Sequence, residues 1–346
     1  MLAQTMMRVA RAARAPVQRC ALRTFAVTSG EDVALNWSLV DDDITPLNNA
    51  YRNLSVRGLI QRAKGTHGPN KSLAVAPGDK PGDAAVSAAD VAKALSNVED
   101  VFVVDAAVGS FRGSEVLVRA VTDDAGLALS LQHLLVRTGG ASTASSGSDH
   151  PIKLFHSSTG SPGISASVSD LGATIVATGN VGVEHIQEAI TDATHKLMAT
   201  GEDELNVLPL AANVYVDGKG ATTLEIDVSG KGSVSAPKKG NSLYGVHGAV
   251  WSHAGIARLF RGAVVDKKAA KTLGAPKAGD VVIGDAVVTS FDEDNLHGHP
   301  TSIVFVGAGK KKADAKSLFA KVARSDAEVE KFDALVKKHG VSISTR

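Results

Sequence analysis

A glycine-rich turn after an apolar stretch is the strongest candidate for chemistry in this sequence. The stretch 224–228 predicts a strand, and the turn after it contains Ser229, Gly230, Lys231, Gly232, Ser233 and Val234. A catalytic phosphate loop wraps backbone N–H groups around the phosphates and needs a Lys and a Ser or Thr directly after its last glycine. Ser233 and Val234 occupy those two places, so the turn predicts a degenerate phosphate loop. Its backbone at Ser229–Gly232 could still hold phosphate or a nucleotide weakly.

Histidines offer a second chemistry. The candidate group consists of His247, His253, His297 and His299. Imidazole nitrogens suit zinc and similar ions, but Gly298 and Pro300 favour a turn in which these side chains are solvated. Ser229 or Ser233 would need a His and an acid beside it to act as a nucleophile. We therefore expect no metal site, no catalytic residue and no cofactor.

Residues 1–27 differ from the rest of the chain. They contain five arginines and no acidic residue, and apolar residues are spaced among alanines. A basic, acid-free, amphipathic start is typical of a mitochondrial presequence. The only cysteine, Cys20, belongs to this segment, so the processed chain would have no thiol nucleophile and no disulfide.

Composition and charge limit the classes of partner. The chain has 346 residues, of which 44% are hydrophobic and 4% aromatic, as in an ordinary α/β protein. No apolar run approaches the ~18 residues of a spanning helix, so we expect no transmembrane helix. Without the presequence, 32 of the 37 basic residues remain against 36 acidic ones, a formal charge of about −4. This charge argues against a nucleic-acid partner.

The hydrophobic pattern predicts alternating helices and strands. Helices are expected at 55–64, 87–97, 125–136, 183–197, 313–323 and 326–338. Strands are expected at 73–75, 101–104, 116–121, 152–155, 174–177, 210–216, 223–228, 243–250, 281–289 and 302–306. The order predicts an α/β fold with mixed sheets.

The succession of short motifs resembles the phosphoenolpyruvate carboxykinase family, most closely its ATP-using branch. The residues that carry the resemblance are Arg52-Asn53-Leu54-Ser55, Val103-Val104-Asp105-Ala106, Val118-Arg119, Val136-Arg137, Ala212-Asn213-Val214, Ser229–Gly232 and Leu243-Tyr244-Gly245. They occur in family order over residues 50–306. The resemblance implies a carboxykinase-like N-terminal domain at 51–220 and a truncated, degenerate P-loop domain at 221–306. An irregular arm at 28–50 and a helical tail at 307–346 lie outside this scaffold.

The resemblance also implies which positions should hold chemistry. The family clamps its anionic substrate with an Arg, and Asp83 stands at that place. A further family Arg, which assists phosphoryl transfer, aligns with Thr301. A carboxylate in place of a guanidinium would repel an anionic substrate.

The metal ligands implied by the resemblance are a Lys, a His and an Asp. Gln187 and Glu188 replace the two lysines of the family motif, Pro209 replaces the His, and Val246 replaces the Asp. Phosphoryl transfer depends on positioning and on neutralising charge. We therefore expect a catalytically inactive pseudoenzyme.

An inactive enzyme scaffold with a mitochondrial presequence is most simply a recruited building block. We expect a non-catalytic accessory or structural subunit of a large mitochondrial assembly, either a respiratory-chain complex or the ATP synthase. It would lie on the matrix side, peripheral to the inner membrane. The arm 28–50 and the tail 307–346 are the candidate docking segments.

Three alternatives remain. The first is a divergent mitochondrial carboxykinase that converts ATP and oxaloacetate to phosphoenolpyruvate. The second is an accessory protein of the mitochondrial ribosome, which the acidic charge of the processed chain disfavours. The third is a nucleotide sensor that uses only the backbone of Ser229–Gly232.

Overall fold

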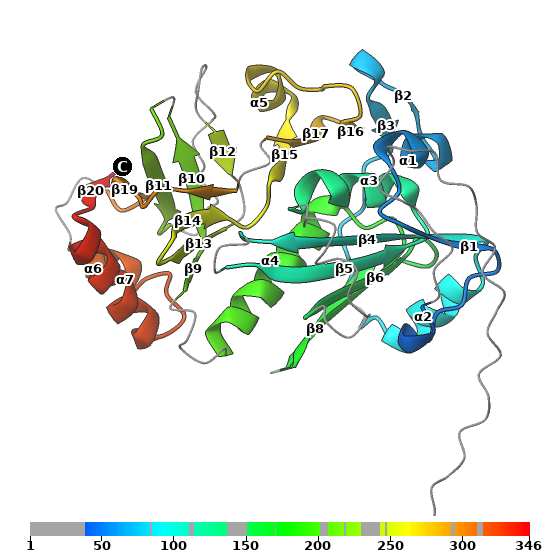
Figure 1. Ribbon diagram of the computed structural model, residues 1–346, viewed down its shortest axis with the longest axis horizontal. Coiled ribbons are helices and arrows are strands. Elements are labelled where there is room, and N and C mark those ends of the chain that lie inside the picture. The colour runs from blue at the N-terminus through cyan, green and yellow to red at the C-terminus, as the bar shows by residue number, and fades with distance from the viewer. Residues whose placement is uncertain are drawn as a thin grey trace, which may run out of the picture.

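The chain folds as a mixed α/β protein with several mixed sheets, as the sequence predicts (Figure 1). The computed structural model describes residues 39–83, 85–110, 114–136, 151–169, 171–200, 207–217, 219–229, 243–245, 248–291, 295–309 and 314–346. The presequence, part of the arm and the turn 230–234 lie outside the described residues. No helix in the described part of the chain is both long and apolar enough to cross a membrane.

A six-stranded sheet forms the centre of the N-terminal half. Its strand order is β1-β4-β5-β6-β8-β7. The strands are β1 (Asn49–Arg52), β4 (Asp100–Val108), β5 (Val116–Thr122), β6 (Ile152–Ser157), β8 (Gly172–Thr178) and β7 (Gly163–Ser169). Because β5, β6 and β8 run parallel, their carboxyl ends meet at one edge.

Helices cover both faces of this sheet. One face carries α3 (Ala125–Leu134) and α4 (Val183–Thr200), with α1 (Val56–Arg62) packed on α3. The other face carries α2 (Ala88–Ser96) and a short turn of helix, η1 (Val40–Asp42). All ten residues of α3 are buried, because strands of a second sheet cover its outer side.

That second sheet joins segments from distant parts of the chain. Its order is β15-β17-β16-β3-β2. The strands are β15 (Gly262–Asp266), β17 (Ala286–Ser290), β16 (Val281–Ile283), β3 (Leu73–Val75) and β2 (Thr66–His67), with η2 (Pro69–Lys71) between β2 and β3 and α5 (Lys267–Thr272) after β15. Since β3 pairs in parallel with β16, residues from both sides of position 220 share one hydrophobic cluster.

The remaining strands form a second core. A five-stranded sheet has the order β12-β10-β11-β19-β20, and a four-stranded antiparallel sheet has the order β18-β14-β13-β9. The first contains β12 (Leu243–Gly245), β10 (Ala212–Val216), β11 (Thr222–Asp227), β19 (Ser302–Val306) and β20 (Ser342–Thr345). The second contains β18 (Leu296–His297), β14 (Gly255–Arg258), β13 (Ala249–Ser252) and β9 (Leu208–Leu210).

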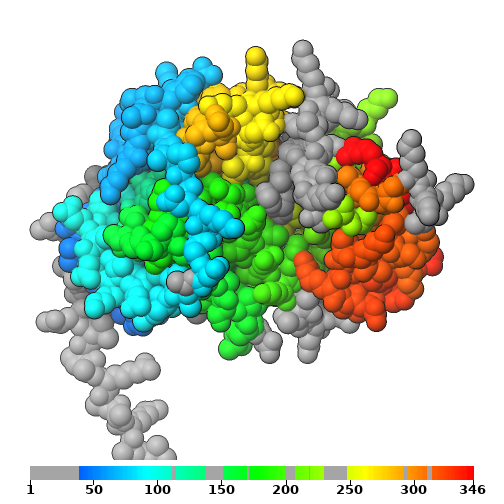
Figure 2. All heavy atoms as spheres, turned by 180° about the vertical axis from the view of Figure 1, so that it is seen from behind, coloured from blue at the N-terminus to red at the C-terminus, as the bar shows by residue number. Residues whose placement is uncertain are grey.

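The C-terminal tail is built into this second core. The helices α6 (Ala315–Phe319) and α7 (Asp326–His339) bury Leu318, Phe319 and Phe332 against both sheets. The strand β20 then pairs in parallel with β19. Figure 2, which views the molecule from behind, shows this tail in orange and red as a compact part of one end of the molecule.

Three predicted strands are wrong in extent, because the chain changes sheet within them. The stretch 210–216 bends at Ala211 and divides between β9 and β10. The stretch 243–250 divides between β12 and β13, and 281–289 is a hairpin that turns at Gly284, whose φ is +55°. The sequence reading also missed β1, β2, β7, β14, β15, β18 and the helix α5, and it missed β20, so the tail is not helical throughout. The other predicted helices and strands are confirmed in type, but α6 spans only Ala315–Phe319 of the predicted 313–323, and β4 runs to Val108, beyond its predicted end at 104.

Candidate functional site

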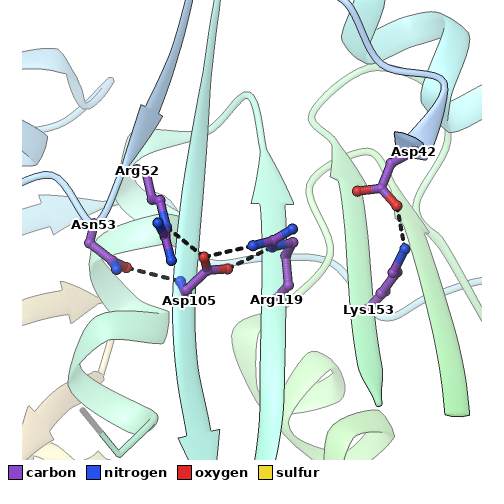
Figure 3. Close-up of polar contacts among 6 residues, drawn as sticks. All are labelled: Asp42, Arg52, Asn53, Asp105, Arg119 and Lys153. Atoms are coloured by element: carbon purple, nitrogen blue, oxygen red, sulfur yellow. Dashed lines mark hydrogen bonds and ion pairs between the residues drawn. The ribbon is translucent and has the colours of Figure 1, made fainter. Parts of the chain in front are cut away.

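Four of the residues that carry the family resemblance meet on one face of the six-stranded sheet (Figure 3). Arg119 on β5 lies directly opposite Asp105 on β4 in the antiparallel register. Its Nε and Nη2 donate to the two carboxylate oxygens of Asp105 at 2.8 and 2.9 Å. Arg52 on β1 donates to the same carboxylate at 2.7 Å, and the side chain of Asn53 accepts from the backbone N–H of Asp105 at 2.9 Å.

Burial makes this network a structural element of the sheet. The side chains of Asp105 and Arg119 have no exposed surface, whereas Arg52 is partly exposed. A buried carboxylate with a bidentate guanidinium is satisfied in both charge and geometry. Removal of one partner would leave the other charge buried, at a cost of about 3–5 kcal/mol. We therefore assign the network to fixing the register of β1, β4 and β5.

A second ion pair lies on the same face. Lys153 on β6 is the register neighbour of Arg119, and its ammonium contacts the carboxylate of Asp42 at 2.5 Å. This pair ties η1, the first described helical turn, to the sheet (Figure 3). The arm is therefore anchored from residue 39 onward.

The loop that contains Asp79, Lys80 and Asp83 lies beside the start of α4. The backbone N–H of Asp79 donates to Asn180 at 2.6 Å, and that of Gly182 donates to Asp79 at 3.1 Å. A Cβ at Gly78 would lie 2.4 Å from Gly182, so only glycine permits this approach. The structure thus brings the loop of Asp83 next to the helix that bears Glu188.

Acidic residues outnumber basic ones in this loop and helix start. Segments 79–83 and 181–188 contain four carboxylates, at Asp79, Asp83, Glu184 and Glu188, and one lysine, Lys80. The side chain of Glu188 is 59% exposed and lies 3.4 Å from His185. Gln187 is fully buried, and neither of its amide atoms has a hydrogen-bond partner among the described residues.

The other singled-out positions lie in the second half of the fold. Pro209 is in β9, where it pairs with Val250 of β13. Thr301 precedes β19 and donates its hydroxyl to the carbonyl of Thr222 at 3.0 Å. Both are used in packing and strand pairing. Val246 lies outside the described residues.

The structure describes only the beginning of the turn that the sequence predicts to be a degenerate phosphate loop. Strand β11 ends at Asp227, one residue before the predicted end, and the hydroxyl of Ser229 donates to the Asp227 carboxylate at 2.6 Å. The backbone N–H of Ser229 donates to the same oxygen at 2.8 Å. Gly230, Lys231, Gly232, Ser233 and Val234 lie outside the described residues.

The histidines of the second core make aromatic contacts. His299 accepts a hydrogen bond from the Trp251 indole at 3.1 Å and stacks on His339 with ring centroids 3.7 Å apart. Burial lowers the pKa of both imidazoles, and the neighbouring Lys338 lowers both further. No group of three or more metal-ligating side chains occurs among the residues that the structure describes.

A buried histidine lies where the two cores meet. His195 on α4 accepts a hydrogen bond from Arg324, which lies between α6 and α7. Burial, and next the charge of Arg324, lower the pKa of His195 to about 3. Because its imidazole is neutral and accepts from a guanidinium, we assign His195 to joining the tail to the N-terminal half. The sequence reading missed this contact, since the two residues are 129 positions apart.

A cavity of about 240 Å³ opens at the carboxyl ends of β5, β6 and β8. Its wall also includes the ends of α1 and β3 and the first turn of α3. Ligands of open α/β sheets bind at this edge. The sequence reading missed the cavity, although Arg62 and Lys64, which line it, stand at the end of a helix that was predicted.

No protein-family model matches this chain, and no curated protein matches its sequence.

Proposed function

We propose that the chain is a non-catalytic accessory subunit of a large mitochondrial complex, built on a degenerate carboxykinase-like scaffold. The respiratory chain and the ATP synthase are the proposed hosts, on the matrix side of the inner membrane. The proposal combines two arguments: a site that is unsuited to phosphoryl transfer, and a presequence typical of mitochondrial import.

The acidic loop and helix start carry the first argument. Phosphoryl transfer needs cations that neutralise the charge developing on the phosphoryl oxygens. The clustered segments 79–83 and 181–188 offer four carboxylates and a single lysine. These segments offer too few cations to neutralise a phosphoryl group during its transfer. This observation favours a structural role over a divergent carboxykinase.

Packing of the tail narrows the choice of docking segment. Because α6, α7 and β20 complete the second core, their deletion would unfold that core and would not test docking. The described part of the arm instead exposes Val40 and Leu47, at 60% and 66%. We therefore assign docking to the arm.

Substitution of these two residues tests the docking assignment. Val40→Asp with Leu47→Asp should leave the melting temperature unchanged within a few degrees, since both side chains are exposed. The doubly substituted chain should be lost from the complex, as seen by native electrophoresis of solubilised mitochondria. The matched control is Leu171→Asp, at another exposed leucine, in the β7–β8 turn. Assembly of the double variant at the wild-type level would contradict docking through the arm.

Calorimetric titration with ATP and Mn²⁺ separates this proposal from its enzymatic alternatives. A flat titration supports the non-catalytic role. Binding that saturates with ATP and metal together would favour a carboxykinase or a nucleotide sensor.

A further inference from the structure

The cavity at the carboxyl ends of β5, β6 and β8 lies apart from the degenerate phosphate loop, which begins after β11 in the second core. A water molecule occupies roughly 30 Å³ in the liquid. A volume of about 240 Å³ is therefore large enough for a small organic molecule.

Apolar side chains form much of the wall. Val75, Leu127, Val183 and Ile283 contribute from four different elements or their ends. A polar ligand without a hydrocarbon part would leave these apolar side chains in contact with water. Small-molecule sites typically combine such an apolar wall with a few placed polar groups. The wall therefore fits a ligand with a short apolar body.

Two cations stand at the cavity. Arg62 is held in place, because its guanidinium lies 4.6 Å from the centre of the Tyr51 ring and donates to the carbonyl of Gly58 at 3.3 Å. Lys64 follows two residues later and is exposed. Among the described residues neither cation forms an ion pair with a carboxylate. Both can therefore bind an anionic group.

The two carboxylates in the wall already have partners. Asp123 accepts from the backbone N–H of Ser158 at 2.7 Å and from its hydroxyl at 3.0 Å. Asp124 is the N-cap of α3 and accepts from the backbone N–H of Gly126 at 2.7 Å. These bonds fix both carboxylates in the wall. Both oxygens of Asp123 and one of Asp124 therefore already accept hydrogen bonds, whereas the Lys64 ammonium has no partner among the described residues.

We propose that this cavity binds a small organic anion, with a carboxylate or phosphate head at Arg62 and Lys64 and a short apolar body against Val75, Leu127, Val183 and Ile283. The binding requires no metal and no phosphate loop. It goes beyond the proposed role as a subunit and does not depend on it, because it is measured on the isolated chain.

Titration of the purified full chain with four probes tests the proposal. The probes are hexanoate, pentyl phosphate, hexan-1-ol and hexylamine, and binding is measured by calorimetry and by ligand-observed NMR. We expect hexanoate, pentyl phosphate or both to bind at least about tenfold more tightly than the alcohol and the amine, because only the anions pair with the two cations. The preferred head group identifies the source of the ligand as an organic acid or a phosphate ester.

Three variants test whether the anion binds in this cavity. Lys64→Glu should weaken binding of the anion about tenfold or more. Ala76→Trp should abolish it by filling the cavity from an exposed loop position. The matched control is Lys93→Glu on α2, which lines a separate cavity on the other face of the sheet and should leave binding unchanged. Circular dichroism and thermal melting establish that all three variants fold.

Absence of binding by every probe would overturn the proposal. Equal binding of the amine, or unchanged affinity in Lys64→Glu, would overturn it as well.

Discussion

Both cores of this protein are hydrophobic clusters, but each contains a different additional interaction. The first core is a six-stranded sheet with a buried charge network, in which Arg52 and Arg119 share the carboxylate of Asp105. The second core is closed by aromatic packing, in which Phe332 of the tail stacks on Phe319 and meets Trp251 edge to face. The difference indicates which substitutions should harm each half most: loss of a paired charge in the first core, and loss of an aromatic ring in the second.

Breaking the charge network should have the largest effect on the free energy of unfolding. Arg119→Ala should lower the free energy of unfolding by about 4–5 kcal/mol, because it leaves the carboxylate of Asp105 buried with only Arg52 beside it. Denaturant unfolding followed by circular dichroism measures the loss. Lys153→Met is the comparison on the same face: the Lys153 side chain is 26% exposed but leaves an Asp42 carboxylate that is only 4% exposed, so the loss should be smaller, about 1–3 kcal/mol. Equal losses in the two variants would contradict the role assigned to Arg119.

The second core should lose slightly less stability when its central aromatic ring is removed. Phe332→Ala should cost about 3–4 kcal/mol, since the side chain is fully buried between Phe319 and Trp251. The sequence has two tryptophans, Trp37 and Trp251. In a Trp37→Phe background, fluorescence of Trp251 therefore reports on this core alone. A small loss, below about 1 kcal/mol, would show that the tail does not stabilise the second core.

Acid should weaken the second core and its junction with the first. The pKa values of His195, His299 and His339 are lowered in the folded chain, so below about pH 6.5 the unfolded chain binds protons that the folded chain does not. Stability is therefore complete above about pH 6.5 and falls as the pH drops. For His195, whose pKa is about 3, the loss is about 1.4 kcal/mol for each pH unit.

The measurement is the free energy of unfolding between pH 7.5 and 5. His195→Gln removes the titrating group at the junction and should flatten the slope. A wild-type stability that is constant over this range would contradict the assigned protonation states.

Removal of a helix cap should have the smallest effect on stability, and the effect should be the same in both cores. Ser55 caps α1 in the first half, and Ser325 caps α7 in the second, each accepting a backbone N–H of its helix at about the same distance. Replacement of either by Ala should cost about 1 kcal/mol, measured by thermal unfolding. If the two stability losses differ strongly, one helix contributes to its core mainly through its own local stability.

The sequence predicts most elements of this fold, because their signals are local. Ser55 and Ser87 mark helix starts, and the spacing of the leucines in 125–136 marks α3. The division of 210–216 between two sheets has no local signal, since it depends on which strand each half meets. The same is true of the tail, whose packing on the second core requires partners far away in the sequence.

The candidate site is less predictable than the fold. The motifs with Asp105 and Arg119 are visible in the sequence, but their contact follows from the register of β4 and β5. The cavity collects residues from α1, β3, β16 and the ends of β5, β6 and β8, so no single segment shows it. The approach of segments 79–83 and 181–188 likewise depends on the contact between Asp79 and Asn180.

The most direct test of the central proposal is the native mass of the protein in gently solubilised mitochondria, with its co-migrating proteins identified. The account predicts migration with a respiratory-chain complex or the ATP synthase, in a particle many times heavier than the 35.6 kDa chain. Migration as a monomer or small oligomer would contradict it.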